Sequence, residues 1–357
     1  MTLLIQQTLL FAIPLMIVAL AGVFSERSGI INLALEGIMI MGAFVGVLSV
    51  RIFQNLPVFQ QAAKQLALFN AGEPSGSVSG WLKLQGMEVL CMLITAAAGA
   101  IFSLLLSYAS INLKADQTIG GTALNLLAPA ISLFLIRIIV NQNTMNMDNA
   151  QSGASWFLIK KTYFGFAPDA KLGFLGSTFL DQIYLATFLT IIVFVIMSII
   201  LYKTRFGLRI RSCGENPQAA DSLGINVFKM RYAGVTISGA LAGMGGFVYA
   251  LTTSNCSSTG DVAGFGFLAL AVMIFGNWTP LNLAFSSLLF GLFKCIAASY
   301  SSLDINGDGV YLLTQIGVSS HLYRMLPYII TLLVLAFTSK GSRAPKAEGI
   351  PYDKGSR

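Results

Sequence analysis

Charged side chains are scarce in this sequence. Asp, Glu, Lys and Arg make up 10% of the 357 residues, whereas hydrophobic residues make up 55%. Because a soluble domain carries about 25% charged residues, the chain lacks the polar surface that a water-soluble fold needs. Its mean hydropathy of +0.74 agrees with this conclusion. The composition excludes an ordinary soluble domain and indicates a protein that lies in a lipid bilayer.

The residues and motifs of common enzymes are also missing. His321 is the single histidine, so no His-based metal site or Ser-His-Asp triad can be built. The sequence contains no Gly-x-x-x-x-Gly-Lys-Ser/Thr phosphate loop, no Gly-x-Ser-x-Gly turn and no dinucleotide-binding glycine pattern. We therefore expect no enzymatic activity, no ATP hydrolysis by this chain and no bound cofactor.

Metal-binding spacings are weak or absent. None of the four cysteines forms a CxxC pair, and Cys91 and Cys295 fall within apolar runs, where small core residues are expected. Asp304, Asn306 and Asp308 match the first half of a calcium-binding loop, but a glutamine replaces the bidentate Glu of that pattern. We expect a polar turn there, no metal site and no disulfide framework.

Long apolar runs dominate what is present, and about 20 apolar residues in a helix cross the hydrocarbon core of a bilayer. The run at 262–276 is short and rich in glycine, so we expect it to be re-entrant or tilted. The predicted fold class is all-α, a polytopic membrane bundle of about eight to ten transmembrane helices. It forms one domain over residues 1–338, and a basic tail at 339–357 is poorly ordered unless it docks. The expected spans are 3–24, 28–50, 87–110, 117–140, 179–202, 232–252, 262–276, 280–299 and 324–338.

Basic residues are concentrated on one side of this bundle. Segment 203–231 contains six Lys or Arg residues and the tail 339–357 contains five, whereas segment 300–323 contains none. Since positively charged loops stay in the cytoplasm, we expect both basic segments to be cytoplasmic and the N-terminus to lie outside. Loops 51–86, 141–178 and 300–323 are then extracytoplasmic. This placement explains most of the net charge of +7, so we expect contact with membrane lipid and no nucleic-acid partner.

A compact polar stretch lies between the fifth and sixth expected spans. Asn216 is a good helix N-cap, Pro217 suits the first helical position, and Gly224 suits the left-handed residue that ends a helix. The sequence thus predicts a cytoplasmic helix of about two turns, too short to be stable alone. Ala219 and Ala220 would let another surface approach it closely. This helix is either a force-transmitting contact with another protein or an ordinary amphipathic loop helix.

Polar side chains within the spans are candidates for a substrate pathway. Asn32 and Glu36 are four residues apart, so one helix face would carry both, and Asn125 lies midway along another span. A carboxylate within a span is costly in lipid and should face the bundle interior or a cavity. These three side chains either line the pathway or make structural hydrogen bonds between helices. Lys294 either snorkels to the outer surface or faces an aqueous cavity.

Small residues recur at a spacing that favours close helix packing. Gly42 and Gly46 are four residues apart in the second span, as are Gly239 and Gly243 in the sixth. Such pairs let helix backbones approach closely in a bilayer. We expect these glycines at helix–helix contacts.

Several different motifs are distributed along most of the chain. They lie at residues 26–29 through 36–37, 121–125, 214–217 through 224–225, 266–271 with 274–276, 326–328, 343–345 and 351–353. With them, the chain resembles the permease subunits of bacterial ABC importers of the branched-chain amino acid, ribose and nucleoside type. The Ser-Glu-Arg-Ser-Gly opening and the Arg-Ala-Pro…Pro-Tyr-Asp tail look most like the purine-nucleoside, simple-sugar-like branch. Gln117 departs from the family pattern, because members usually have an acidic residue there.

The resemblance implies a set of partners in the bacterial inner membrane. A multi-pass permease of this kind pairs with a second permease, often a related chain, and an extracytoplasmic substrate-binding lipoprotein delivers the nucleoside. A cytoplasmic ATP-binding-cassette ATPase binds ATP and Mg. The family also implies that the polar stretch is the coupling helix, seated in a groove of the ATPase. The matching residues are Glu215, Asn216, Pro217, Ala219, Ala220 and Gly224.

We therefore expect a transmembrane permease subunit that translocates nucleosides by alternating access. Simple sugars and branched-chain amino acids are alternative substrates, because cavity specificity depends on side-chain geometry and on the binding protein. An ion-coupled secondary transporter is the alternative class. Its clear candidates for intramembrane ion ligands are Glu36 and Lys294.

Overall fold

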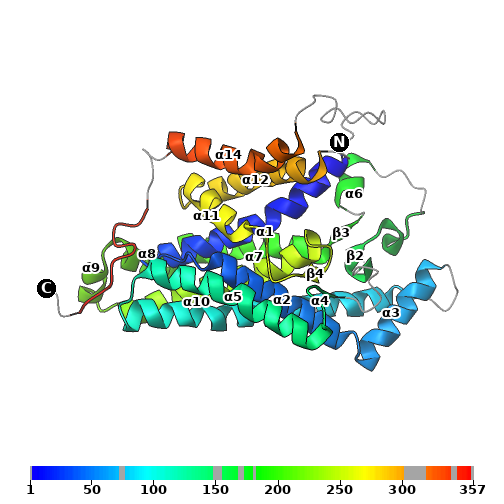
Figure 1. The fold of residues 1–357 in the computed structure, drawn as a ribbon, viewed down its shortest axis with the longest axis horizontal. Helices are drawn as coiled ribbons and strands as arrows, with labels where there is room; N and C mark the ends of the chain where they lie inside the picture. Colours follow the sequence, from blue (N-terminus) through cyan, green and yellow to red (C-terminus); the bar gives the residue numbers. More distant parts are fainter. Residues whose placement is uncertain are drawn as a thin grey trace.

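The computed structural model describes residues 2–71, 77–147, 155–167, 173–179, 182–300, 319–338 and 344–354. These residues are predominantly helical, as predicted (Figure 1). The long helices are α1 (Thr2–Glu26), α2 (Leu35–Phe53), α4 (Ser79–Ser107), α5 (Gln117–Val140), α7 (Leu185–Lys203), α10 (Val227–Thr252), α12 (Pro280–Ser299) and α14 (Ser320–Thr338). The shorter ones are α3 (Pro57–Asn70), η1 (Tyr108–Asn112), η2 (Ser155–Phe157), η3 (Lys161–Phe164), α6 (Phe174–Phe179), α8 (Arg205–Glu215), α9 (Pro217–Ser222) and α11 (Phe265–Phe275).

Seven of the described helices are long and apolar enough to cross a membrane: α1, α2, α4 with η1, α5, α7, α10 and α12. The bounds of some predicted spans are corrected. The second span begins at Leu35, because the residues before it form turns, and the sixth already begins at Val227. The predicted span 262–276 is helical only in α11, whose 11 residues are fewer than a crossing requires. The predicted loop 51–86 is largely helical, in α3 and the start of α4.

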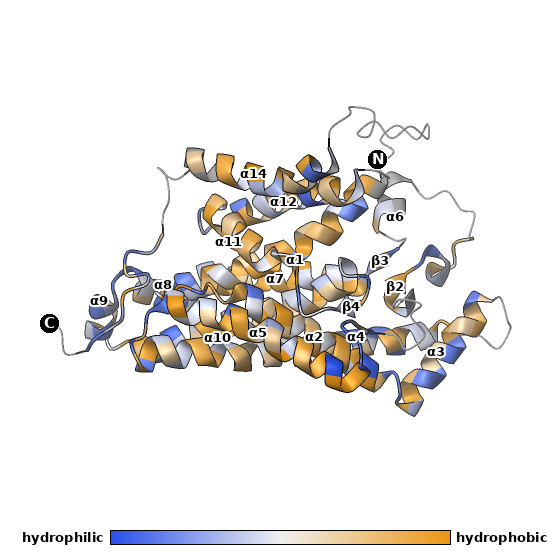
Figure 2. Cartoon of the chain, viewed as in Figure 1, coloured by the Kyte–Doolittle hydropathy of each residue, from blue (hydrophilic) through white to orange (hydrophobic). Residues whose placement is uncertain are grey.

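Helices α1, α2 and α10 form the centre of the bundle. In their most apolar windows, 78%, 72% and 83% of the residues are buried, against 22% in α5 and 28% in α7. Helix α10 packs against α4, α1 and α2, and α1 also packs against α12. The outer helices leave large apolar side chains exposed, among them Leu126 and Phe134 of α5. Figure 2 shows these apolar faces on the long helices, which suits contact with lipid or another subunit.

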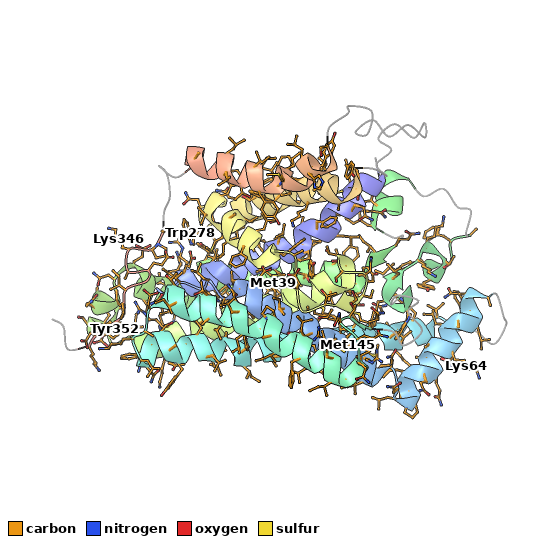
Figure 3. All side chains as sticks on the ribbon, in the orientation of Figure 1. Met39, Lys64, Met145, Trp278, Lys346 and Tyr352 are labelled. Carbon is orange, nitrogen blue, oxygen red and sulfur yellow. The ribbon has the colours of Figure 1, made fainter. Side chains whose placement is uncertain are left out.

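Two small antiparallel sheets lie away from α9, toward the opposite end of the bundle (Figure 1). Strand β1 (Met145–Asn146) pairs with β4 (Ser257–Ser258), and β2 (Leu158–Ile159) pairs with β3 (Ile183–Tyr184). The registers place Met145 opposite Ser258 and Leu158 opposite Tyr184. In Figure 3, Lys64 and Met145 lie toward this end, whereas Lys346 and Tyr352 lie at the other. The basic segment around α8 and the described tail residues thus lie at the opposite end of the bundle from α3 and the two small sheets.

Candidate functional site

A buried carboxylate of α2 contacts the start of the short helix α11. Glu36, in the first turn of α2, is 6% exposed. Its Oε1 accepts a hydrogen bond from Gly264 N at 2.9 Å, and its Oε2 accepts from Gly266 N at 2.6 Å and Phe267 N at 3.3 Å. These donors are the first N–H groups of α11, which have no partner within the helix and favour a negative charge. Glu36 therefore ties α2 to α11.

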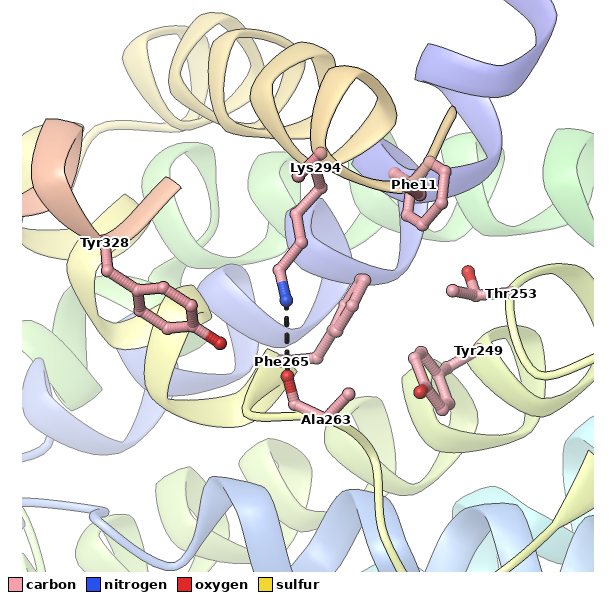
Figure 4. Close-up of a pocket in the computed structure, with 9 residues that line it drawn as sticks. Phe11, Tyr249, Thr253, Ala263, Phe265, Lys294 and Tyr328 are labelled. Atoms are coloured by element: carbon pink, nitrogen blue, oxygen red, sulfur yellow. Dashed lines mark hydrogen bonds between the residues drawn. The ribbon is translucent and has the colours of Figure 1, made fainter. Parts of the chain in front are cut away.

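A cavity of about 530 Å³ lies beside this contact (Figure 4). Lys294 of α12 points into it, and its Nζ donates a hydrogen bond to Ala263 O at 3.3 Å. The same Nζ lies 4.8 Å from the ring centroid of Phe265 and 5.4 Å from that of Tyr328, and a cation is attracted to such ring faces. Lys294 was expected either to snorkel to the outer surface or to face a cavity, and the structure supports the second interpretation. The lining residues are Phe11, Tyr249, Thr253, Ala263, Phe265, Lys294, Ala297, Ala298 and Tyr328.

The aromatic walls of this cavity were not predicted from the sequence. Phe11, Tyr249, Phe265 and Tyr328 come from four different helices, α1, α10, α11 and α14. In apolar spans, aromatic residues carry no local signal that distinguishes a cavity wall from a core residue. Lys294 was the single signal, since a lysine within a span is rare.

Asn32 does not share a helix face with Glu36, and that prediction is wrong. Residues 30–32 form no regular structure, and α2 begins only at Leu35. The buried Asn32 donates from Nδ2 to Ser238 Oγ at 2.9 Å, and its Oδ1 accepts from Ala34 N at 3.1 Å. Asn32 therefore ties the turn before α2 to α10, and it is absent from the lining of the cavity.

Two further amides hold the same turn to α5. Asn125 accepts through Oδ1 from Gly37 N at 2.8 Å and donates from Nδ2 to Leu33 O at 2.7 Å. Gln117, which replaces the usual acidic residue, accepts through Oε1 from Ile31 N at 2.7 Å. Of the three candidate pathway residues, Glu36 alone hydrogen-bonds to the segment that lines the cavity, and Asn32 and Asn125 lie apart from it.

The four glycines considered for helix packing lie where helices meet. A Cβ on Gly42 of α2 would overlap the backbone of Gly243 in α10, and one on Gly46 would overlap an aromatic ring of α10. Gly239 and Gly243 also face α4, where a Cβ on either would overlap backbone atoms. These contacts bring α2, α10 and α4 together at backbone distance.

The predicted capped helix is present as α9. Asn216 accepts through Oδ1 from Ala219 N at 3.0 Å, Pro217 is the first helical residue, and Gly224 has a φ of +81°. Helix α9 has six residues, which is shorter than the two turns expected. It lies next to α8 and the C-terminal segment, at one end of the molecule (Figure 1).

The two alanines of α9 face different directions, so they do not form one shared approach surface as predicted. Ala220 is buried against Val227 and Tyr352, whereas Ala219 is exposed. The largest exposed apolar side chain next to α9 is Leu223, which is 82% exposed. Leu223 was not predicted, although an apolar residue directly before a helix-ending glycine in a polar stretch is a usable signal.

The described part of the tail, residues 344–354, docks beside α9. Ala347 N donates to Gly214 O at 2.8 Å, and Arg231 Nη1 donates to Ile350 O at 2.9 Å. Tyr352 is buried in the same cluster. The sequence predicts that the tail is ordered only if it docks, and the described part of the tail does dock.

A charged cluster joins the end of α1 to Glu215, the last residue of α8. Arg27 Nη1 lies 3.3 Å from Glu215 Oε1. Trp278 Nε1 donates to Glu26 Oε2 at 2.5 Å, and the carboxyl groups of Glu26 and Glu348 are hydrogen-bonded. Burial raises the pKa of Glu348 to about 7, against the opposing effects of the Glu26 bond and the Arg27 charge. Glu348 therefore holds a proton more tightly in the docked tail than a solvent-exposed carboxyl group does.

The weak metal motif cannot be placed. Asp304, Asn306 and Asp308 lie outside the described residues. Within the described ranges, no group of three His, Cys, Asp or Glu side chains could hold a metal ion. His321 is exposed near the start of α14, and Cys91 and Cys295 are buried in the core, as predicted.

Comparison with known proteins gives the chain a family. Residues 4–335 match the family described as "Branched-chain amino acid transport system / permease component". The nucleoside ABC transporter permease protein NupC of Lactococcus lactis is 41% identical over 350 residues, which cover 98% of this chain and 96% of NupC. The guanosine ABC transporter permease protein NupQ of Bacillus subtilis is 39% identical over 359 residues, which cover 100% and 98%. The nucleoside ABC transporter permease protein NupB of the same Lactococcus strain is 25% identical over 302 residues, 80% of each chain. No solved structure matches this chain.

These matches extend along nearly the whole chain and agree with its architecture. Proteins of this family are permease components, which are transport subunits and not enzymes. Seven described helices can cross a membrane, as a multi-pass protein of the bacterial inner membrane requires. The chain therefore belongs to the family of permease components of branched-chain amino acid transport systems.

Proposed function

We propose that this chain is one permease subunit of an ATP-driven nucleoside importer that works by alternating access. The observation that carries the proposal is the identity of 41% and 39%, over nearly the full length, to permeases named for nucleoside and guanosine transport. The cavity around Lys294 supports it, because it combines a largely apolar, aromatic lining with a few polar groups, among them the ammonium group of Lys294, as small-molecule sites do.

The partner permease is a related but different chain. The Lactococcus strain has two nucleoside ABC transporter permease proteins, NupC and NupB, and both align with most of this chain. The much higher identity to NupC supports a heterodimer in which this chain takes the NupC-like position. The exposed apolar faces of α5 and α7 offer surface for such a contact.

A separate ATPase supplies the energy, with ATP and Mg bound to that partner. Helix α9 is the coupling helix, and Leu223, Ala219 and Glu215 form its docking surface. This role is supported by their exposure and by the packing of α9 on α8, α10 and the tail. Because Arg27 pairs with Glu215 at the end of α8, a displacement of α9 together with the end of α8 would also move the end of α1.

A substrate-binding lipoprotein delivers the nucleoside at the opposite end of the bundle. That end carries α3 and the two small sheets (Figure 1). The solute would then enter the cavity beside α11.

The experiment is reconstitution of the chain with its second permease, ATPase and binding lipoprotein in proteoliposomes. We expect uptake of labelled guanosine that requires ATP on the side of the membrane where the ATPase lies. Excess ribose or leucine should not reduce this uptake. Uptake at the full rate without the ATPase, driven by an ion gradient, would establish a secondary transporter instead. If the transporter imports ribose or leucine in an ATP-dependent manner but does not import guanosine, the substrate is not a nucleoside.

A further inference from the structure

The ammonium group of Lys294 has hydrogen-bonding capacity left for a ligand. A lysine ammonium carries three N–H donors and no acceptor. In the described part of the chain, Lys294 makes one hydrogen bond, to Ala263 O at 3.3 Å, and otherwise faces the rings of Phe265 and Tyr328. A ligand in the cavity can therefore accept hydrogen bonds from it.

The neighbouring carboxylates do not neutralise this cation by direct contact. Both oxygens of Glu36 are engaged by backbone N–H groups of α11. Asp261 accepts from Ala263 N at 3.0 Å. Glu36 and Asp261 act on Lys294 through their charge, but among the described residues neither forms an ion pair with it. A positive charge held in a membrane helix without an ion pair is costly, so a functional role is the default interpretation.

The walls of the cavity suit a flat aromatic ligand. Phe11, Tyr249, Phe265 and Tyr328 line it around Lys294 (Figure 4). Stacking of a nucleic-acid base on an aromatic side chain contributes about 1–3 kcal/mol and tolerates every base. The aromatic walls thus explain affinity for a base but do not distinguish one base from another. Discrimination has to come from the polar groups of the lining, of which Lys294 is the charged one.

We propose that Lys294 binds the acceptor edge of a 6-oxopurine base and makes transport prefer guanosine and inosine to adenosine. The inference rests on the proposed function. Guanine presents two adjacent acceptors, O6 and N7, whereas adenine presents N7 beside an amino group that is itself a donor. A lysine can donate to both guanine acceptors, but its donors oppose the adenine amino group. Lys294 is therefore a specificity-determining residue of the cavity.

The test compares uptake of labelled guanosine, inosine and adenosine by the complete transporter, with the same binding lipoprotein throughout. Lys294→Met keeps an unbranched side chain that is one atom shorter and removes its donors, and Lys294→Arg keeps the charge. The matched control is Lys346→Met, which removes an exposed lysine at the other end of the molecule. We expect Lys294→Met to lower the guanosine-to-adenosine uptake ratio about 5- to 140-fold, the range that a correct base contact supplies. Lys294→Arg should retain most of the preference, and Lys346→Met should leave it unchanged.

An unchanged ratio in Lys294→Met would overturn the inference, provided that both nucleosides are still imported. If the wild-type transporter imports no nucleoside at all, the proposed function itself fails. If Lys294→Met does not assemble, thermal shifts of the purified wild-type complex without binding lipoprotein decide the question. Protection by guanosine and inosine but not by adenosine supports the inference, and equal or no protection by all three contradicts it.

Discussion

The carboxylate of Glu36 accepts a hydrogen bond from the backbone of Gly266 at 2.6 Å, across 230 residues of sequence. This bond fixes the start of α11 against α2, on the wall of the cavity that contains Lys294. Its strength and its place make it the first contact to test.

Glu36→Gln should destabilise the protein by about 3 kcal/mol, at the upper end of what a hydrogen bond to a charged group contributes. The amide would lose the negative charge and present an NH₂ group to backbone donors. Thermal unfolding of the purified protein in detergent measures the change. Glu215→Gln is the matched control, because its carboxylate is half exposed and surface ion pairs contribute at most about 1 kcal/mol. Equal losses in both variants would show that the α11 contact is unimportant.

Gly243→Ala should destabilise the bundle by about 1–3 kcal/mol, the usual range for overpacking. Its Cβ would overlap the Thr95 carbonyl of α4, and backbone atoms cannot move aside easily. The fraction of folded protein after size-exclusion chromatography and the unfolding temperature report the effect. Gly86→Ala is the control, since a Cβ there meets nothing within 4 Å. Alanine at this helical position should be neutral or stabilising.

Asn216→Ala should reduce the uptake per ATP hydrolysed. Loss of an N-cap costs about 1 kcal/mol, a large fraction of the stability of a six-residue helix. Asn226→Ala removes an equivalent cap, the 3.0 Å bond to Lys229 N, from the much longer α10. Parallel measurements of nucleoside uptake and ATPase rate should show uncoupling only in Asn216→Ala. Similar uncoupling in both would mean that the effect is not specific to α9.

Leu223→Asp should prevent the ATPase from co-purifying with the permease, because a charge would enter the proposed docking surface. Leu208→Asp is the control, since Leu208 is also exposed but lies on α8. Pull-down from detergent extracts gives the ratio of ATPase to permease. Retention of the ATPase by Leu223→Asp would remove Leu223 from the interface.

Docking of residues 344–354 should weaken as the pH rises. Burial raises the pKa of Glu348 from 4.5 to about 7 in the docked state, so the docked tail binds a proton more tightly than the released tail. The resulting stabilisation is complete below about pH 4.5 and is lost as the pH rises through about 7. A fluorophore on Lys354→Cys should show greater mobility by anisotropy at pH 8 than at pH 6. Glu348→Gln should flatten this response, and an unchanged response would assign it to another group.

Local features of the structure could be predicted from the sequence, because their causes lie within a few residues. The caps of α9 depend only on Asn216, Pro217 and Gly224 and are present as expected. The apolar runs likewise predicted most of the membrane helices. The bounds were less accurate where a helix continues through polar residues, as α10 does at its first turn.

Partners that are distant in the sequence could not be predicted. The burial of Glu36 followed from its place in an apolar run, but its donors lie in α11, far along the chain. Asn32 was misplaced because four-residue spacing implies one face only if the segment is helical. The choice between two environments for Lys294 required the positions of α11 and α14, which no local pattern contains.

The burial of α1 has a consequence for biogenesis. Its neighbours α10 and α12 are encoded far downstream, so α1 enters the membrane long before the surfaces that cover it are synthesised. During that interval lipid covers the apolar surface of α1 in place of protein. A substitution that prevents α10 from packing should therefore leave α1 without its protein neighbour. We expect it to cause early proteolysis near the N-terminus.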